Sequence, residues 1–221
     1  MISFENVSVG FDSHTILDDV SLKINQEEFV FLVGQTGSGK TTLLRLIYMD
    51  LFPTSGTVTI GKYLSSSVSR PQIPYLRRKI GVVFQDFKLL EDRNVFDNVA
   101  FALQVTNTKG QEVKRRVLRI LADVGLSHKR NRMPYELSGG EQQRASIARG
   151  LVNEPFILLA DEPTGNLDPA TATEILELLK DINIRGTAVL MTTHNYELVR
   201  KSRERIVQIK NGKLFEVVVR R

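Results

Sequence analysis

The chain has 221 residues, of which 42% are hydrophobic and 25% charged, a composition that can bury a core of normal size without covalent cross-links. It has no cysteine, which excludes disulfides, thiolate metal sites and a cysteine nucleophile. The net charge of +5 indicates either a solvated surface or an anionic ligand or membrane surface. The densest basic cluster, Arg77-Arg78-Lys79, is too short to predict nucleic-acid binding.

Strand and helix patterns alternate along most of the chain. We predict, in order, strands at Ile2–Val9, Ile16–Ile24 and Phe29–Val33, a helix at Thr41–Met49, strands at Thr57–Ile60 and Ile80–Phe84, helical structure over 87–137, a strand at Phe156–Ala160, a helix at Glu174–Lys180, a strand at Ala188–Thr193 and a hairpin of Ile206–Ile209 with Leu214–Val218 turned by Asn211-Gly212. This order predicts an α/β fold with a parallel core, an N-terminal antiparallel β piece and a helical insert.

We expect no signal peptide, because a strand pattern begins directly at Ile2. No apolar run approaches the roughly 20 residues that span a bilayer. We therefore expect a soluble chain, whose membrane role would require a separate partner.

A glycine-rich loop, Gly34-Gln35-Thr36-Gly37-Ser38-Gly39-Lys40-Thr41, lies between a buried strand and a helix. This is the pattern and context of a phosphate-binding P-loop. Glycines allow successive backbone N–H groups to point at one anion, and the helix start adds its positive dipole end. Lys40 is predicted to contact the β- and γ-phosphates, and the Thr41 hydroxyl to ligate Mg²⁺.

Two adjacent carboxylates, Asp161 and Glu162, follow the apolar strand at Phe156–Ala160. Ligands of open α/β sheets bind at the carboxyl ends of the strands. Asp161 is predicted to hold the Mg²⁺ that Thr41 also contacts. Because successive strand residues face opposite ways, we expect that Glu162 does not share the position of Asp161 and is free to orient and deprotonate the attacking water.

A second helix start carries the sequence Leu137-Ser138-Gly139-Gly140-Glu141-Gln142-Gln143-Arg144. Ser138 and Glu141 have the spacing of a capping box. The two glycines are poor helix formers, which is explained if a phosphate approaches the backbone there. A second anion-binding helix start, in a chain with one P-loop, predicts that two copies of the chain share each nucleotide.

The segment 137–144 resembles the signature of ABC ATPases, and almost the whole chain follows that family's order of motifs. The resemblance implies a single ABC ATPase domain with a RecA-like P-loop NTPase core, in which 1–86 and 138–221 form the β subdomain and core and 87–137 the helical subdomain. It also implies a head-to-tail homodimer that binds and hydrolyses ATP with Mg²⁺.

The resemblance assigns roles to further residues. Phe11 resembles the aromatic side chain that stacks on adenine, with a place in the apolar core as the alternative. Gln85 resembles the glutamine that links Mg²⁺ and water to the transporter contact, and Asp168 the acid of the loop crossing the dimer interface. His194 resembles the histidine at the γ-phosphate. At Gly165 the sequence departs from the family, where many members carry serine.

The predicted site residues fall into three groups. The catalytic residues are Glu162, His194, Gln85 and Lys40, and the Mg²⁺ ligands are Thr41, Gln85 and Asp161. The residues that bind ATP are Phe11, Gly34, Gln35, Thr36, Gly37, Ser38, Gly39, Lys40, Thr41, Thr42, Ser138, Gly139, Gly140 and Asp168.

Three stretches, 83–90, 92–100 and 160–168, resemble a cell-division branch of the family, and the last is shared with lipoprotein-releasing and macrolide-type exporters. The resemblance implies an integral membrane partner and a peripheral location at the cytoplasmic face of the bacterial inner membrane. Some apolar side chains of Phe87–Phe101 are expected in the core and others in a groove for that partner. DNA-repair and ribosome-binding ATPases are disfavoured, since their long insertions or second cassette are missing.

Overall fold

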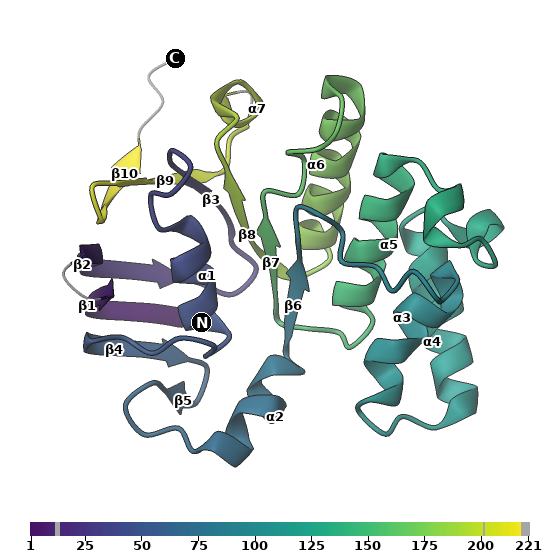
Figure 1. The fold of residues 1–221 in the computed structure, drawn as a ribbon, viewed down its shortest axis with the longest axis horizontal. Helices are drawn as coiled ribbons and strands as arrows, with labels where there is room; N and C mark the ends of the chain where they lie inside the picture. The colour runs from purple at the N-terminus through teal and green to yellow at the C-terminus, as the bar shows by residue number, and fades with distance from the viewer. Residues whose placement is uncertain (12–13, 201, 218–221) are drawn as a thin grey trace.

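The computed structural model describes residues 1–11, 14–200 and 202–217 (Figure 1). Its strands are β1 (Ile2–Phe11), β2 (His14–Ile24), β3 (Phe29–Val33), β4 (Ser55–Ile60), β5 (Tyr63–Leu64), β6 (Ile80–Val83), β7 (Ile157–Asp161), β8 (Ala188–Thr193), β9 (Arg205–Lys210) and β10 (Lys213–Val217). Its α-helices are α1 (Lys40–Ile47), α2 (Ile73–Arg77), α3 (Val95–Gln104), α4 (Gly110–Asp123), α5 (Gly139–Leu151), α6 (Pro169–Ile184) and α7 (Tyr196–Arg200). The predicted α/β class is confirmed.

A six-stranded sheet with the order β10-β9-β3-β8-β7-β6 forms the centre of the molecule. All neighbours are parallel except the terminal hairpin pair, β9 and β10. The turn of that hairpin uses Asn211 and Gly212, both with positive φ, as an Asn-Gly turn requires. The predicted hairpin is confirmed, although its last predicted residue, Val218, lies outside the described residues.

The central sheet is buried on both faces, which explains the uninterrupted apolar sequence of β3. Phe29, Phe31 and Val33 belong to the core cluster shared with α3–α6, whereas Val30 and Leu32 belong to the cluster shared with α1 and the N-terminal sheet. Alternate residues of one strand thus contribute to two cores. This double burial holds the ends of the strands in place.

The N-terminal strands form a separate antiparallel sheet with the order β2-β1-β4-β5 (Figure 1). It packs across α1 onto the central sheet, because its buried side chains share one cluster with Leu43, Leu44 and Ile47 of α1. The sequence predicted this sheet and its first three strands but not β5.

The helical insert contains α3 and α4, which lie beside α5 on one side of the molecule (Figure 1). In α4, Val113, Val117 and Leu121 are buried on one face of the helix, and Gly125 follows the helix with φ of 78°. α5 contacts both α3 and the edge strand β6. The division between 87–137 and the rest of the chain stays a prediction. The sequence did not predict α2 and α7, which are short, and predicted only the middle of α6.

Candidate nucleotide-binding site

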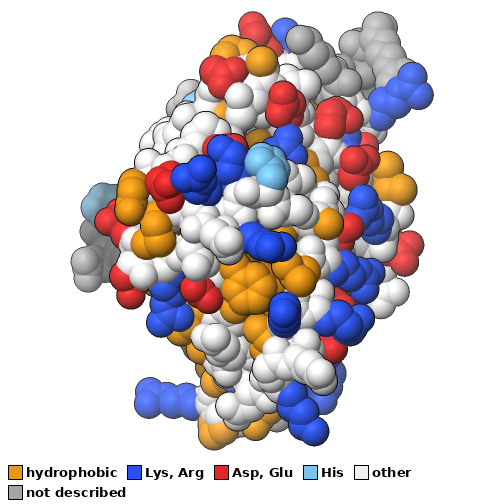
Figure 2. Space-filling model, turned by 90° about the vertical axis from the view of Figure 1, so that its right-hand side faces the viewer, with side chains coloured by type: hydrophobic (Ala, Val, Ile, Leu, Met, Phe, Trp, Pro, Cys, Tyr) orange, Lys and Arg blue, Asp and Glu red, His pale blue; other side chains and the backbone are white. Residues whose placement is uncertain are grey.

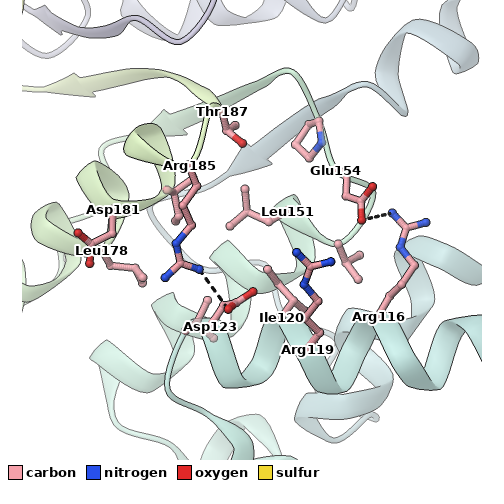
Figure 3. A pocket seen from close by; sticks show the side chains of 14 residues that line it. Arg116, Arg119, Ile120, Asp123, Leu151, Glu154, Leu178, Asp181, Arg185 and Thr187 are labelled. Atoms are coloured by element: carbon pink, nitrogen blue, oxygen red, sulfur yellow. Dashed lines mark ion pairs between the residues drawn. The ribbon is translucent and has the colours of Figure 1, made fainter.

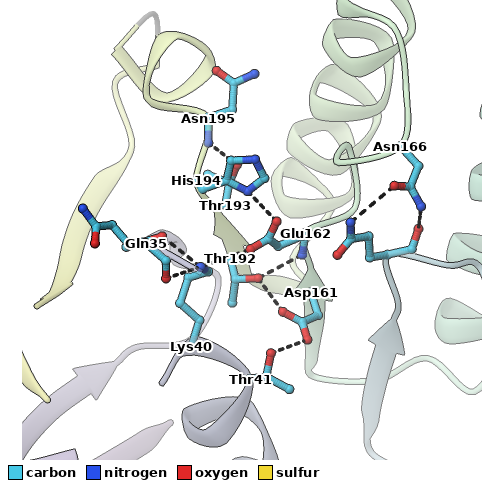
Figure 4. Close-up of polar contacts among 12 residues, drawn as sticks. Gln35, Lys40, Thr41, Asp161, Glu162, Asn166, Thr192, Thr193, His194 and Asn195 are labelled. Atoms are coloured by element: carbon cyan, nitrogen blue, oxygen red, sulfur yellow. Dashed lines mark hydrogen bonds and ion pairs between the residues drawn. The ribbon is translucent and has the colours of Figure 1, made fainter. Parts of the chain in front are cut away.

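The residues predicted to bind phosphate and metal meet at the carboxyl edge of the central sheet (Figure 4). The glycine-rich loop follows β3, Asp161 and Glu162 come at the end of β7, and His194 comes directly after β8. These three strands are parallel neighbours, so their carboxyl ends lie at one edge. A cavity of about 260 Å³ lies there, lined by Ile16, Thr36, Gly37, Gly39, Lys40, Thr41, Thr42, Gln85, Asp161 and Glu162.

The glycine-rich loop requires its glycines for conformation and for close packing. Gly39 caps α1 with φ of 106°, a left-handed conformation that favours glycine. A Cβ at Gly34 would lie 2.6 Å from Ser38 Oγ and from a methyl group of Ile209. The loop therefore curls tightly over the start of α1, as the pattern predicted.

Lys40 is the first residue of α1, and its side chain is 5% exposed. Its ammonium donates to the carbonyl oxygens of Gly34 (2.8 Å) and Gln35 (3.1 Å). It also forms an ion pair of 3.1 Å with Glu162. A buried charge needs such partners, and they hold the ammonium in the wall of the cavity.

Asp161 bridges the P-loop helix and β8. The Thr41 hydroxyl donates to Asp161 Oδ2 at 3.0 Å, and the Thr192 hydroxyl donates to Asp161 Oδ1 at 2.7 Å. The same Thr192 oxygen accepts from the backbone N–H of Glu162 at 2.9 Å. Thr192 is fully buried and was not among the predicted site residues, because a threonine inside a strand carries no signal of its contacts.

Glu162 lies beyond the end of β7 and has φ of 46°, a left-handed conformation. The alternation of strand side chains therefore stops at Asp161, and both carboxylates line the same cavity. They do not share one position in it, as expected: the Asp161 carboxylate contacts the Thr41 and Thr192 hydroxyls. The Glu162 carboxylate instead contacts the Lys40 ammonium through Oε1, at 3.1 Å, and His194 Nδ1 through Oε2, at 2.6 Å. Its side chain is 14% exposed and that of His194 54%.

Gln85 follows β6 and exchanges two hydrogen bonds with Asn166 from the loop after β7. Gln85 Nε2 donates to Asn166 Oδ1 at 3.3 Å, and Asn166 Nδ2 donates to the Gln85 carbonyl at 3.2 Å. A Cβ at Gly165 would lie 3.0 Å from Gln85 Nε2. The departure from serine at Gly165 thus leaves room for this contact between the two loops.

The segment after Gln85 is held by an arginine that the sequence did not mark. Phe87 and Lys88 both have positive φ, and their carbonyl oxygens accept from Arg149 of α5 at 2.9 and 2.5 Å. Burial lowers the pKa of the Arg149 guanidinium. Arg149 therefore connects the helix that starts at Ser138 with the loop that carries Gln85.

Ser138 is the N-cap of α5 and forms the predicted capping box. Its hydroxyl accepts from the Glu141 N–H at 3.3 Å, and Glu141 Oε2 accepts from the Ser138 N–H at 2.9 Å. This second bond lowers the pKa of Glu141, with help from Lys129. A Cβ at Gly140 would lie 2.5 Å from a methyl group of Thr171 in α6, so Gly140 has a packing role within the chain as well.

Asp168 is the N-cap of α6. It accepts from the Thr171 hydroxyl (2.5 Å) and from the N–H groups of Ala170 and Thr171, and these bonds lower the pKa of the Asp168 carboxyl. Neither Asp168 nor the segment Ser138–Gly140 lines the cavity of its own chain.

The side chain of Phe11 lies outside the described residues, so its predicted contact with adenine stays a prediction.

This fold and this cavity define an ATP-binding cassette. A family model described as ABC transporter matches residues 17–165, and the chain belongs to that family. Its relatives include the cell division ATP-binding proteins FtsE of Mycobacterium tuberculosis, 49% identical over 97% of this chain and 94% of that protein, and of Escherichia coli, 42% identical over 97% of each.

Solved structures agree with the family assignment. The dimeric cassette MJ0796 in a post-hydrolysis state bound to ADP and phosphate is 36% identical, with a TM-score of 0.86, and the match covers 100% of this chain and 99% of that one. The cassette cbiO1 of Clostridium perfringens is 29% identical, with a TM-score of 0.90, and the match covers 97% of this chain and 86% of that one. The chain is an ATP-binding, ATP-hydrolysing ABC subunit.

None of the helices in the described parts of the chain has the length and apolar character needed to cross a membrane.

We predict that Thr192→Val lowers the free energy of unfolding by about 1–3 kcal/mol, since it leaves the buried Glu162 N–H without an acceptor and removes the donor to Asp161. Urea denaturation measures the loss. Thr192→Ser retains the hydroxyl and is the matched control. Equal stability of the valine variant and the parent would show that this bridge does not hold the end of β7.

Proposed function

We propose that this cavity binds ATP together with Mg²⁺ and that Glu162 acts as the general base for hydrolysis. The observation that carries the proposal is the position of the Glu162 carboxylate, which lies between the Lys40 ammonium and the His194 ring. Glu162 lines the same cavity as Thr41 and Asp161, which are hydrogen-bonded to each other. Phosphoryl transfer depends mainly on positioning and charge neutralisation, which this arrangement provides.

The residues present fit the phosphates of a nucleotide. The start of α1 directs free N–H groups into the loop, and Lys40 contributes one positive charge. The Ser38 hydroxyl is buried in the same loop and has no hydrogen-bond partner among the described residues. Apart from its two chain neighbours, no described residue has an atom within 4 Å of the Cβ position of Gly37, which leaves its backbone approachable. We assign residues 34–42 to phosphate binding, and Phe11 to the adenine.

The residues also fit Mg²⁺, which would be held by Thr41 Oγ1 and Asp161 Oδ2, with Gln85 at the edge of the cavity. Mg²⁺ takes oxygen ligands and is commonly bound through one carboxylate plus substrate phosphates. Within the described residues there is no cluster of three or more histidine, cysteine or acidic side chains that would form a metal cage without substrate. When bound, the ion neutralises charge on the phosphates.

Glu162 is suited to accept the proton of the attacking water, since its carboxylate is mostly buried and aimed into the cavity. His194 contacts Glu162 Oε2 from the side of β8 and would fix its orientation near the γ-phosphate. Lys40 would exchange its contacts with the Gly34 and Gln35 carbonyls for the phosphates. Gln85 would position the water and, through Asn166, link it to the loop that ends at Asp168.

We propose that two copies of the chain bind two ATP molecules head to tail. Ser138 is exposed and Gly139 and Gly140 are half-buried, and this helix start does not reach the cavity of its own chain. Asp168 lies at the start of the neighbouring helix. The start of α5 offers a second site for the γ-phosphate. The related cassette MJ0796 is dimeric with ADP and phosphate bound, which supports this arrangement.

We propose that the chain serves in cell division as the FtsE relatives do, driving an integral membrane partner that resembles FtsX and controlling septal cell-wall hydrolases. It would act as a peripheral protein at the cytoplasmic face of the bacterial inner membrane. Identity of 42–49% to FtsE proteins over 97% of the chain supports this assignment. The alternative is the ATPase subunit of a lipoprotein-releasing or macrolide-type exporter, suggested by the shared segment 160–168.

The surface beside α3 supports a membrane partner. Val95, Val99 and Ala100 are core residues, whereas Phe101 and Val105 are 37% and 56% exposed. A groove of about 390 Å³ runs between α2 and the end of α3, lined by Pro74, Arg77, Arg78, Ala102, Val105, Thr106 and Asn153. Figure 2 shows the side of α3 and α4, where hydrophobic side chains gather among Lys and Arg. We assign this groove to a short cytoplasmic helix of the partner.

Glu162→Gln is expected to retain ATP and to lower the rate of hydrolysis about 10²–10⁴-fold, since the amide cannot accept the proton of water. Phosphate release and gel filtration with ATP measure the two effects, with accumulation of an ATP-bound dimer expected. Glu197→Gln, an exposed position in α7, is the control. Hydrolysis at the parent rate would remove Glu162 from the role of base.

Ser138→Arg is expected to bind ATP as a monomer and to fail to dimerise, because a long side chain would occupy the start of α5. The variant is combined with Glu162→Gln, which retains ATP, and light scattering in the presence of ATP measures whether it is a monomer or a dimer. Ser138→Ala is the matched control, since it removes the cap at a cost of about 1 kcal/mol without adding bulk. Normal dimers of the arginine variant would contradict the shared site.

The two candidate branches of the family are separated by the membrane protein that copurifies with this chain in mild detergent. We expect a four-span protein whose large outer domain binds a cell-wall hydrolase or its activator. An outer domain that binds lipoprotein or macrolide instead would assign the chain to the exporter branch.

A further inference from the structure

A second cavity, of about 270 Å³, lies at the opposite edge of the central sheet from the nucleotide cavity (Figure 3). Pro155 and Thr187 in its wall precede β7 and β8, whereas Asp161 and His194 come at the other ends of these strands. Three helices complete the wall: α4, the end of α5 and the second half of α6. The volume is close to the lower end of the range for small-molecule sites, about 300 Å³.

The floor of this cavity is apolar and its rim is charged. Ile120, Leu151, Leu178 and Ile182 are among the side chains that form the floor. At the rim, Arg185 forms an ion pair of 3.1 Å with Asp123, and Arg116 one of 3.5 Å with Glu154. Each of these arginines is therefore neutralised by a carboxylate that also lines the cavity.

Arg119 lies between these two pairs and differs from them. Its guanidinium stands over the cavity in Figure 3 and has no ion-pair or hydrogen-bond partner among the residues that the structure describes. The remaining carboxylate, Asp181, lies at the edge of the cavity, beyond the Arg185–Asp123 pair in the same view. The opening above the apolar floor thus presents one positive charge that no described residue pairs with.

Three elements in the wall also carry residues that we assign to nucleotide binding, in this chain or in a second copy. α5 begins at Ser138 and contributes Leu151 to the cavity, and α6 begins at Asp168 and contributes Leu178 and Ile182. β7 follows Pro155 of the wall and ends at Asp161. A molecule bound here would contact α4 and α6 together, and so would restrain the packing of the helical insert against the core.

We propose that this cavity is a regulatory site for a small amphipathic anion. The ligand would consist of a medium-length alkyl chain with one carboxylate. The apolar floor takes the chain and Arg119 takes the carboxylate, for which a guanidinium has the matching geometry. A polyphosphate is disfavoured, because Arg119 is the one cation of the rim that lacks an acidic partner among the described residues. The inference that the site regulates hydrolysis rests on the proposed function of Ser138, Asp168 and Glu162.

The test uses octanoate as the probe and the full chain labelled with ¹³C at isoleucine methyl groups. Octanoate is expected to shift the Ile120 and Ile182 resonances saturably and to leave Ile60, in the N-terminal sheet, unchanged. Arg119→Gln is expected to weaken binding about tenfold. Lys114→Gln, which removes one charge from an exposed position of the same helix, is the control with parent affinity. Leu178→Trp, which fills the cavity from a partly buried position, is expected to abolish binding.

Several outcomes would overturn the proposal. Shifts of Ile120 and Ile182 that do not saturate, or equal binding by octanol, would exclude an anion site at Arg119, as would parent affinity of Arg119→Gln.

In the same samples octanoate is expected to lower the ATPase rate at least twofold in the parent but not in Leu178→Trp. Saturable binding with an unchanged rate would overturn the regulatory role alone, and a parent chain without ATPase activity would count against the proposed function instead.

Discussion

The nucleotide cavity depends on the parallel pairing of β3, β8 and β7 in a sheet that is buried on both faces. Pairing places the ends of the three strands at one edge, and burial prevents them from moving independently. Thr192 of β8 holds the end of β7 in place, since its single hydroxyl contacts both the Asp161 carboxylate and the backbone N–H of Glu162. The position of the carboxylates therefore follows from the packing of the core rather than from the loops around them.

The helix starts at Ser138 and Asp168 have a structural role within the chain, apart from the contacts that we propose with a second copy. Each side chain caps its helix, and the two starts are in contact through Gly140 and Thr171. A Thr171 bond also holds the Asp168 carboxylate. The surface proposed to face a second copy is consequently preformed, which lowers the entropy that dimerisation would otherwise lose.

α5 connects features that are far apart in the sequence. Its start carries Ser138, its Arg149 holds the carbonyls of Phe87 and Lys88 beside the Gln85 loop, and its last residue lines the second cavity. Because a helix moves as a rigid element, a change at the partner groove or at the second cavity would reach the nucleotide through α5. This continuity offers a physical basis for the coupling that we propose between these surfaces and the nucleotide.

The sequence by itself determined the α/β class, the P-loop, the capping box at Ser138, the pair of carboxylates after β7 and the terminal hairpin, because each depends on local spacing or on the period of apolar residues. Only the tertiary structure decided that Glu162 turns back into the cavity, that Thr192 and Arg149 hold the site, and that Gly140 packs on α6. These features arise from contacts between residues 30 to 62 positions apart, or from one backbone angle at a strand end, which residue patterns do not encode.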